Sequence, residues 1–243
     1  MNFSLIRHFF ARFSFPAILA FAACFATQVY AQSTGQADTM AKRMQACTTC
    51  HGAQGVTSNQ AYFPRIAGKP EGYLFNQLQN FKEGRRHYGL MVGMVEHLSD
   101  AYLLEMAQYF AGLDVPYAPP APLKTPASAV TLQFGKTLAL QGDKKRQLAA
   151  CTSCHGTALM GVLPSTPALL GLPRDYLAAQ LGAWQTGLRR AHAPDCMGRI
   201  AKVLTPSDVD ALSNWLATQP VPSYTKAATN LLQPQTEQCG GAK

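Results

Sequence analysis

Two copies of one pentapeptide hold the residues of this chain that are most able to do chemistry. Residues 47–51 read Cys-Thr-Thr-Cys-His, and residues 151–155 read Cys-Thr-Ser-Cys-His. A C-x-x-C-H sequence is the attachment motif of a c-type haem, whose porphyrin bonds covalently to the two thiols. The histidine that follows then lies beneath the iron as an axial ligand. Two copies predict two covalently bound haem c groups, with these attachment cysteines and histidine ligands: Cys47, Cys50, His51, Cys151, Cys154 and His155.

Zinc is the other metal centre that uses pairs of cysteines at this spacing. A structural zinc ion needs four ligands in a tetrahedral arrangement. A single ion held by both cysteine pairs would join two distant parts of the chain and would leave both histidines unexplained. We therefore expect haem and not zinc.

Each pentapeptide is followed by a methionine at an equivalent position, which is a candidate for the second axial ligand. Met91 precedes Leu98 by seven residues, and Met197 precedes Leu204 by the same number. A thioether is a neutral, soft ligand, so His/Met ligation raises the reduction potential relative to bis-histidine ligation. We expect Met91 and Met197 to complete the coordination of the two irons.

Other side chains close to these methionines leave alternatives open. Met94 follows Met91 by three residues, but its counterpart in the second half is Ile200, so we expect Met94 to pack in the core. His87 and His192 lie in the same two segments. Either histidine could replace a methionine and give a centre of lower potential.

The N-terminal segment, residues 1–31, has the features of a secretory signal peptide. Two arginines precede an apolar stretch at residues 13–26, and residues 29–31 form a cleavage site of mostly small residues. The apolar stretch is too short for a comfortable membrane span. Because covalent haem attachment takes place outside the bacterial cytoplasm, the predicted location is the periplasm. The residues before Cys24 loosely resemble a lipoprotein processing site, so lipidation of Cys24 stays open.

The expected mature chain has two cysteines outside the motifs, Cys196 and Cys239. An even number of such cysteines in an oxidising compartment favours a disulfide. This bond would connect the C-terminal tail to the residue beside Met197 and would contribute on the order of 3 kcal/mol through loop closure. Two free thiols or an intermolecular bond are the alternatives.

The elements that position these residues are predicted to be helices that repeat along the chain. Hydrophobic periodicity predicts helices over residues 38–46, 71–82, 101–110 and 130–150. A loop over residues 85–96 carries Met91. Several positions of residues 64–84 have counterparts 103 residues later, including the tyrosine, leucine and glutamine positions. The chain is therefore expected to be a tandem duplication.

The duplication predicts an all-α fold of two domains, each wrapped around one haem. Five prolines between residues 116 and 126 exclude a regular helix and favour an extended, semi-rigid connection. The predicted organisation is a signal peptide, a first domain, a proline-rich linker and a second domain with a C-terminal tail, at residues 1–31, 32–115, 116–128 and 129–243.

Charge is distributed unevenly between the two predicted domains. Residues 32–115 carry seven basic and seven acidic side chains, whereas residues 129–243 carry eleven basic and six acidic ones. A basic second domain could steer the protein towards an acidic partner, although a solvated surface without a docking role explains the same composition. Candidates to pair with the haem propionates are the basic residues near the haem segments: Arg65, Lys69, Arg85, Arg86, Arg189 and Arg190.

These segments resemble the cytochrome c4 family, the dihaem class I cytochromes of the bacterial periplasm. The resemblance covers residues 38–218 and rests on the following motifs: C-x-x-C-H-G twice, G-x-P-x-x-Y-L at residues 68–74 and 171–177, and a methionine segment followed by residues 98–100 and 204–206. It implies two tandem class I cytochrome c domains related by a pseudo-twofold axis. It also implies His51/Met91 and His155/Met197 ligation. The tail with Cys239, and Cys196 beside Met197, depart from the family pattern.

The function that the resemblance implies is electron transfer between a respiratory donor and a terminal oxidase or other acceptor. The donor would be a dehydrogenase or a quinol-oxidising complex of the bc1 type. Two six-coordinate irons leave no position for a substrate, so we expect a carrier and not an enzyme, with no catalytic residue. Alternatives are a dihaem enzyme, such as a peroxidase with one open haem, and a dedicated electron-accepting subunit of a dehydrogenase. We expect no nucleic-acid partner and no transmembrane span in the mature chain; peripheral association with a membrane stays open.

Overall fold

The structure is a computed structural model that describes residues 37–56, 63–223, 226–231 and 238–242. The predicted signal peptide, its cleavage site and Cys24 lie outside the described residues. Met40–Lys243 form one compact unit. No helix among the described residues is long and apolar enough to cross a membrane.

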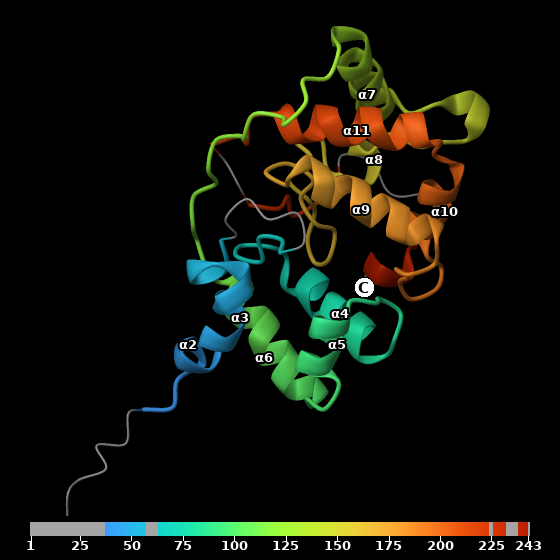
Figure 1. Cartoon of the computed structure of the whole chain (residues 1–243). Helices are drawn as coiled ribbons and strands as arrows, with labels where there is room; N and C mark the ends of the chain where they lie inside the picture. The colour runs from blue at the N-terminus through green and yellow to red at the C-terminus, as the bar shows by residue number, and fades with distance from the viewer. Residues whose placement is uncertain (1–36, 57–62, 224–225, 232–237, 243) are drawn as a thin grey trace, which may run out of the picture. The chain divides into compact units, whose positions relative to one another are not determined.

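Helices make up the regular structure of the described residues, together with a few isolated bridges between extended residues. The first half contains α2 (Met40–Arg43), α3 (Gln45–His51), η1 (Ala53–Gly55), α4 (Glu71–Lys82), α5 (Gly89–Val95) and α6 (Asp100–Ala111) (Figure 1). The second half contains α7 (Ala129–Gln141), η2 (Lys144–Arg146), α8 (Thr152–His155), α9 (Arg174–Gln185), α10 (Cys196–Val203), α11 (Pro206–Thr218) and η3 (Gly240–Ala242).

Each half has its own hydrophobic core. In the first half α4 packs against α6 and α5, and the buried side chains are Met44, Leu74, Phe81, Val95, Leu103, Met106, Ala107 and Phe110. In the second half α9 packs against α11 and α10, around residues that include Leu138, Leu177, Leu204, Leu212, Trp215 and Leu216. The order α4–α5–α6 therefore recurs as α9–α10–α11. Two tandem helical domains are the architecture of the described residues; the boundaries at residues 115 and 129 stay a prediction.

Two helix predictions agree closely with the structure. The helix expected over residues 71–82 is α4, and the one expected over residues 101–110 is α6, which is one residue longer at each end. The side chain of Ser99 accepts a hydrogen bond from the Tyr102 backbone N–H at 3.2 Å, which is an N-cap. Side-chain oxygens in this position satisfy a backbone donor that the helix itself leaves free.

The prediction of one continuous helix over residues 130–150 is wrong. Helix α7 ends at Gln141 because Gly142 adopts a φ of +70°, where a larger residue would be strained. The carboxylate of Asp143 then accepts hydrogen bonds from the backbone N–H groups of Lys145, at 3.0 Å, and Arg146, at 3.3 Å. The chain turns back through η2 and reaches the second pentapeptide as a loop.

Two other segments differ from the prediction. Residues 85–96, expected as a loop, contain the short helix α5, whose two glycines give its sequence a weak helical preference. Residues 38–46, expected as one helix, are divided between α2 and α3. Met91 therefore lies on a helix and not on an open loop.

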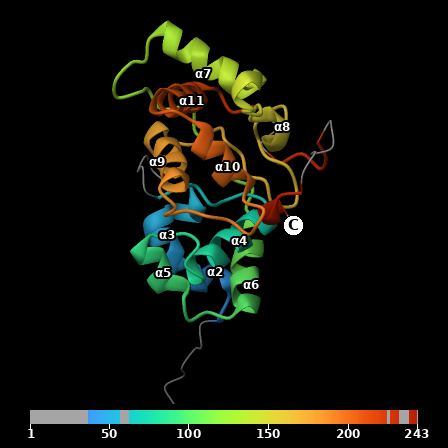
Figure 2. The same cartoon turned by 90° about the vertical axis from the view of Figure 1, so that its right-hand side faces the viewer.

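Helix α7 lies against α11 on the outer side of the second half (Figure 2). Gly135 makes this close packing possible, because a Cβ atom there would collide with the backbone carbonyl of Ala211. The proline-containing connection between the halves is extended and is fixed by Arg65. The Arg65 side chain donates hydrogen bonds to the carbonyls of Val115 and Pro116, and its guanidinium lies 4.0 Å from the centre of the Tyr117 ring.

Candidate haem sites and the contact between them

The two pentapeptide histidines are held in the same way. The carbonyl of Pro64 lies 2.8 Å from Nδ1 of His51, and the carbonyl of Pro167 lies 2.8 Å from Nδ1 of His155. A carbonyl oxygen can only accept, so Nδ1 carries the proton and donates. The lone pair of Nε2 is then free to bind a metal, which is the arrangement expected of a metal-ligating histidine.

The surroundings of both rings favour the neutral, ligating form. His51 is 9% exposed and His155 is 6% exposed. Burial is the main cause that lowers the pKa of each imidazole, and the hydrogen bond to the proline carbonyl only partly opposes it. Neutral imidazole is the form that binds iron.

The cysteines of the pentapeptides are placed for attachment. Cys47 and Cys50 lie on one turn of α3, and Cys151 and Cys154 lie at the start of and within α8. Among the described residues, none of the four forms a disulfide. The glycine after each histidine adopts nearly the same backbone conformation, with φ of +77° at Gly52 and +79° at Gly156. Both pentapeptides thus have the same local fold.

In the second half, the proposed ligands and the attachment cysteines line one cavity. The cavity has about 1630 Å³ of unfilled space, including its opening to solvent, and its walls include Cys151, Cys154, His155 and Met197. The indole Nε1 of Trp184 lines the same cavity and is buried without a hydrogen-bond partner in the described part of the chain. Two thiols, a neutral imidazole, a thioether and an unpaired donor are a chemical fit for a haem c with its carboxylates.

In the first half, Met91 lies on α5 and packs against the first core. His51 lies on α3 of the same half. Met94 is 49% exposed, so the prediction that it packs in the core is wrong. The assignment of Met91 and Met197 as iron ligands stays a prediction.

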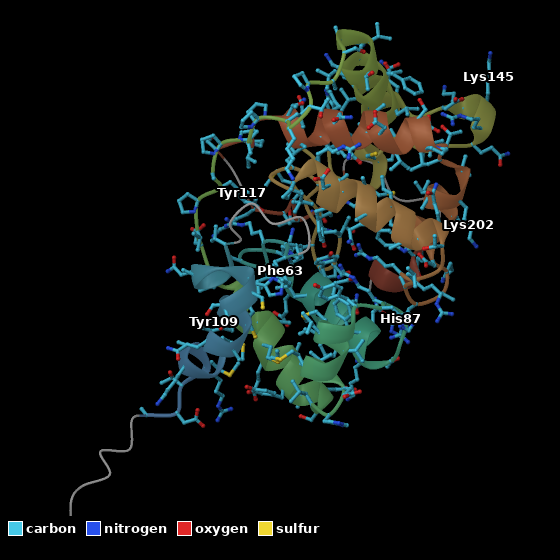
Figure 3. The ribbon with its side chains drawn as sticks, in the orientation of Figure 1. Phe63, His87, Tyr109, Tyr117, Lys145 and Lys202 are labelled. Carbon is cyan, nitrogen blue, oxygen red and sulfur yellow. A yellow bond between two sulfur atoms is a disulfide. The ribbon has the colours of Figure 1, made fainter. Side chains whose placement is uncertain are left out.

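The alternative histidine ligands both lie at the surface. His87 is exposed at the edge of the first half (Figure 3), and its backbone N–H donates to the Leu188 carbonyl at 2.8 Å. Nε2 of His192 lies 2.8 Å from Nη2 of Arg85. An arginine can only donate, so Nε2 of His192 accepts this bond and its lone pair is engaged.

The two halves meet at a pair of equivalent arginines. Arg86 donates to Gln77 of its own half at 3.1 Å, and crosses to the second half to donate to Tyr176 at 3.2 Å and to Gln180 at 2.8 Å. The backbones of Arg86 and Arg189 form an antiparallel bridge. Arg86 therefore links α4 to α9 directly.

Arg189 makes the mirror-image contacts. It donates to Gln180 of its own half at 2.8 Å, and crosses to Tyr73 at 3.2 Å and Gln77 at 3.0 Å. Each contact of Arg86 thus has a counterpart 103 residues away, as a pseudo-twofold relation requires. The spacing of the repeat was visible in the sequence, but the crossing of the two arginines was not.

This contact carries positive charge that no acidic side chain of the described residues neutralises by an ion pair. Among the described residues, neither Arg86 nor Arg189 forms an ion pair with a carboxylate. Burial raises the pKa of Tyr73, but the positive charges of Arg189, Arg86 and Lys69 outweigh it and lower the pKa to about 8. The site therefore has a field that favours anions.

The C-terminal tail is attached beside the second haem site. Cys196 and Cys239 form a disulfide. The backbone N–H of Gly240 donates to the Pro194 carbonyl at 3.0 Å, and the side chain of Asn76 in the first half donates to the Gly241 carbonyl at 3.1 Å. The tail is thus tied both to the start of α10 and to α4.

No family model matches the chain. It is 40% identical over 183 residues to the "Thiosulfate dehydrogenase electron acceptor" of Thiomonas intermedia, which covers 75% of this chain and 82% of that protein. It is 31% identical over 190 residues to the cytochrome c4 of Pseudomonas aeruginosa, which covers 76% of this chain and 90% of that protein. The chain belongs to the cytochrome c4 family.

Solved structures agree with this membership. The reduced cytochrome c4 of Pseudomonas stutzeri has a TM-score of 0.62 and 31% identity, over 72% of this chain and 94% of that one. The thiosulfate dehydrogenase TsdBA of Marichromatium purpuratum has a TM-score of 0.64 and 32% identity over 72% of this chain. This chain spans only 36% of the TsdBA chain.

A cytochrome c4 is a dihaem c-type electron carrier, and this chain has the residues to carry both groups. Each haem c supplies a one-electron redox centre. The protein supplies its covalent attachment, a neutral histidine oriented by a proline carbonyl, and a shared contact of arginine, glutamine and tyrosine side chains between the two domains.

Proposed function

We propose that this cytochrome c4 carries electrons in the periplasm from a thiosulfate-oxidising dehydrogenase to a downstream acceptor such as a terminal oxidase, and that it has no catalytic activity of its own. The observation that carries the donor is the 40% identity to a protein named as the electron acceptor of thiosulfate dehydrogenase, against 31% for a cytochrome c4 of comparable coverage. A second relative with the same name, from Stutzerimonas stutzeri, is 39% identical over 174 residues.

The proposed iron ligands support a carrier. His51 with Met91, and His155 with Met197, would give two closed six-coordinate irons. A closed iron exchanges electrons without binding a substrate, and it changes little in geometry when its charge changes. In the second half His155 and Met197 line one cavity, which is the arrangement that such ligation requires.

The proposed docking surface is the basic face of the second domain. Lys144, Lys145 and Lys202 are exposed and form no ion pair with a described acidic residue. Figure 3 shows Lys145 and Lys202 at the periphery of the second domain. Uncompensated positive charges of this kind accelerate association with an acidic partner, and salt weakens the effect.

A reduction assay tests the donor. Oxidised protein is mixed with purified thiosulfate dehydrogenase and thiosulfate, and haem reduction is followed by stopped-flow absorbance. We expect rapid reduction of both haems, and none when either the dehydrogenase or thiosulfate is omitted. Failure of the complete mixture to reduce the protein would contradict the proposed donor.

The same preparation distinguishes a carrier from an enzyme. The protein alone is incubated with thiosulfate and an artificial electron acceptor, and product is measured. A carrier gives no turnover. Turnover by the purified protein, lost in a variant that lacks one haem, would show that one of the centres is catalytic.

A further inference from the structure

Lys69 is a buried cation that has no counter-ion among the described residues. The residue is 5% exposed, and its ammonium lies 6.0 Å from the centre of the Tyr73 ring. Within the described ranges this ammonium forms no hydrogen bond and no ion pair with an acidic side chain. Burying a charge is unfavourable unless an opposite charge or a set of hydrogen bonds compensates it. An anion should therefore lie beside Lys69.

Trp184 is a second group whose polar atom has no partner in the part of the chain that the structure describes. Its Nε1 is buried and makes no hydrogen bond to any described residue. An indole nitrogen can only donate, so the missing partner must be an acceptor. The guanidinium of Arg189, itself 4% exposed, lies 3.8 Å from the centre of the Trp184 ring and adds positive charge.

Both groups face the same space. Lys69 and Trp184 line the cavity that also contains His155 and Met197. Lys69 belongs to the first domain, whereas the other three belong to the second. A haem c bound to Cys151 and Cys154 would bring two carboxylates into this cavity. We propose that Lys69 and Trp184 bind a propionate of the second haem, so that the first domain completes the second haem site.

The first haem has no equivalent of either group. The counterpart of Lys69, 103 residues away, is Leu172, and the counterpart of Trp184 is Phe81. The arginines, tyrosines and glutamines at the domain contact are the same in both repeats, whereas these two positions are among those that differ. The ammonium and the indole donor therefore act on the second haem alone.

The consequence is an effect on the reduction potential of one centre. A carboxylate near the iron stabilises the ferric form, which carries the additional positive charge. An ammonium and an N–H donor that neutralise this carboxylate remove that preference and raise the potential. The inference rests on the dihaem assignment and is independent of which dehydrogenase supplies the electrons.

Substitutions at both positions test the proposal. Lys69→Met removes the charge at similar length. Trp184→Phe removes the N–H together with part of the ring, and restores the residue type of the first repeat. The holoproteins are titrated by spectroelectrochemistry. We expect each variant to lower the potential of the second haem, with Lys69→Met giving the larger shift and the first haem changing much less.

Three controls make the result decisive. Met91→His is expected to shift the reduction potential of the first haem. Combining it with each variant therefore separates the titration of the first haem from that of the second. Lys136→Met removes an exposed lysine of α7 and measures the effect of net charge alone. Lys69→Arg keeps the charge and should keep the potential of the second haem.

Two outcomes would overturn the proposal. One is that Lys69→Met and Trp184→Phe shift the second potential no more than Lys136→Met does. The other is that the shift appears at the first haem. If Lys69→Met fails to fold, Trp184→Phe and Lys69→Arg still decide the result. Because the readout is a potential, failure here leaves the thiosulfate dehydrogenase assay unaffected.

Discussion

The two domains place the proposed iron ligands on equivalent helices but fix those helices by different means. Helix α10 begins at Cys196, and the Asp195 carboxylate before it accepts from the backbone N–H groups of Gly198, at 2.8 Å, and Ala191, at 2.9 Å. The Cys196–Cys239 disulfide adds a covalent link at the same point. Helix α5 begins after Tyr88 without a side-chain cap. The helix of Met197 is thus fixed by an N-cap and a disulfide, whereas the helix of Met91 is fixed mainly by packing against the first core.

The last helices of the two domains differ in a similar way. Helix α6 has a single N-cap from Ser99. Helix α11 has a full capping box between Thr205 and Asp208, and Asp208 also accepts two hydrogen bonds from Arg146, at 2.6 and 3.3 Å. A duplicated fold has therefore retained its haem-binding residues while its second copy has additional local constraints.

The largest expected effect separates the two haem sites. Replacing both Cys151 and Cys154 by alanine should remove the second haem and reduce the haem content per chain by half, because no thioether can form. The equivalent change at Cys47 and Cys50 should remove the first haem only. Haem is measured by its absorbance in alkaline pyridine against protein concentration. Full haem content in either double variant would contradict the attachment sites.

Removing the disulfide should affect the second haem site more than the first. Replacing Cys196 and Cys239 by serine is expected to lower the free energy of unfolding by about 3 kcal/mol, because the unfolded chain regains its freedom. It should also speed the displacement of Met197 by added imidazole. Urea unfolding and imidazole binding, followed by haem absorbance, measure the two effects. Equal acceleration at both haems would show that the bond does not hold Met197 specifically.

A smaller effect is expected at the buried carboxylate of α11. Asp208 is 1% exposed, so Asp208→Asn should cost about 2 kcal/mol of unfolding free energy, because Arg146 loses its charged acceptor. Asp100→Asn in the first domain is the matched control. Its carboxylate is 60% exposed, so the unfolding midpoint should scarcely move.

The Asp208 carboxylate also makes the free energy of unfolding depend on pH. Burial raises the pKa of Asp208, but hydrogen bonds from Arg146 and Thr205 outweigh it, so the pKa lies below its usual value. A lowered pKa in the folded state stabilises the fold above the unfolded pKa of about 4, and this stability is lost as the pH falls through the folded value. The difference in unfolding free energy between wild type and Asp208→Asn should therefore become smaller as the pH is lowered. A constant difference across this range would contradict the assignment.

The smallest expected effect comes from the helix N-caps that both domains have, Ser99 at α6 and Thr205 at α11. Ser99→Ala and Thr205→Ala should each cost about 1 kcal/mol, because each leaves one backbone N–H at a helix N-terminus without its side-chain acceptor. Urea unfolding measures both. Similar losses would show that the caps are an inherited feature of the repeat. A much larger loss at Thr205 would show that the capping box and Asp208 act as one unit.

Local sequence signals were sufficient for some of this architecture. Residues 71–82 combine helical periodicity with a following glycine, and Ser99 is a strong capping residue, so α4 and α6 could be predicted. Helix α5 could not be predicted, because its two glycines lower the helical preference of the sequence and packing against α4 stabilises the helix. The end of α7 depends on the positive φ of Gly142, which composition alone does not reveal.

The candidate haem sites, too, could be predicted only in part from the sequence. The pentapeptides and the equivalent methionines follow from sequence and spacing. The sequence also offers Lys69 as a propionate candidate, but its proposed place at the second haem does not follow from the sequence, because it depends on which face of the first domain meets the second. In the same way, the sequence offers Arg65 as a candidate for a propionate, but in the structure its guanidinium donates to the carbonyls of Ala67, Val115 and Pro116. Contacts between domains are set by three-dimensional packing that the repeat pattern does not encode.

Iron ligation is tested most directly by the visible spectrum of the oxidised protein, recorded for wild type, Met91→Ala and Met197→Ala. Methionine bound to ferric haem gives a weak charge-transfer band at the red end of the spectrum. We expect the wild type to show this band at the intensity of two haems, and each variant to lose half of it. A high-spin haem in the wild type, or an unchanged band in either variant, would contradict a carrier with two closed His/Met centres.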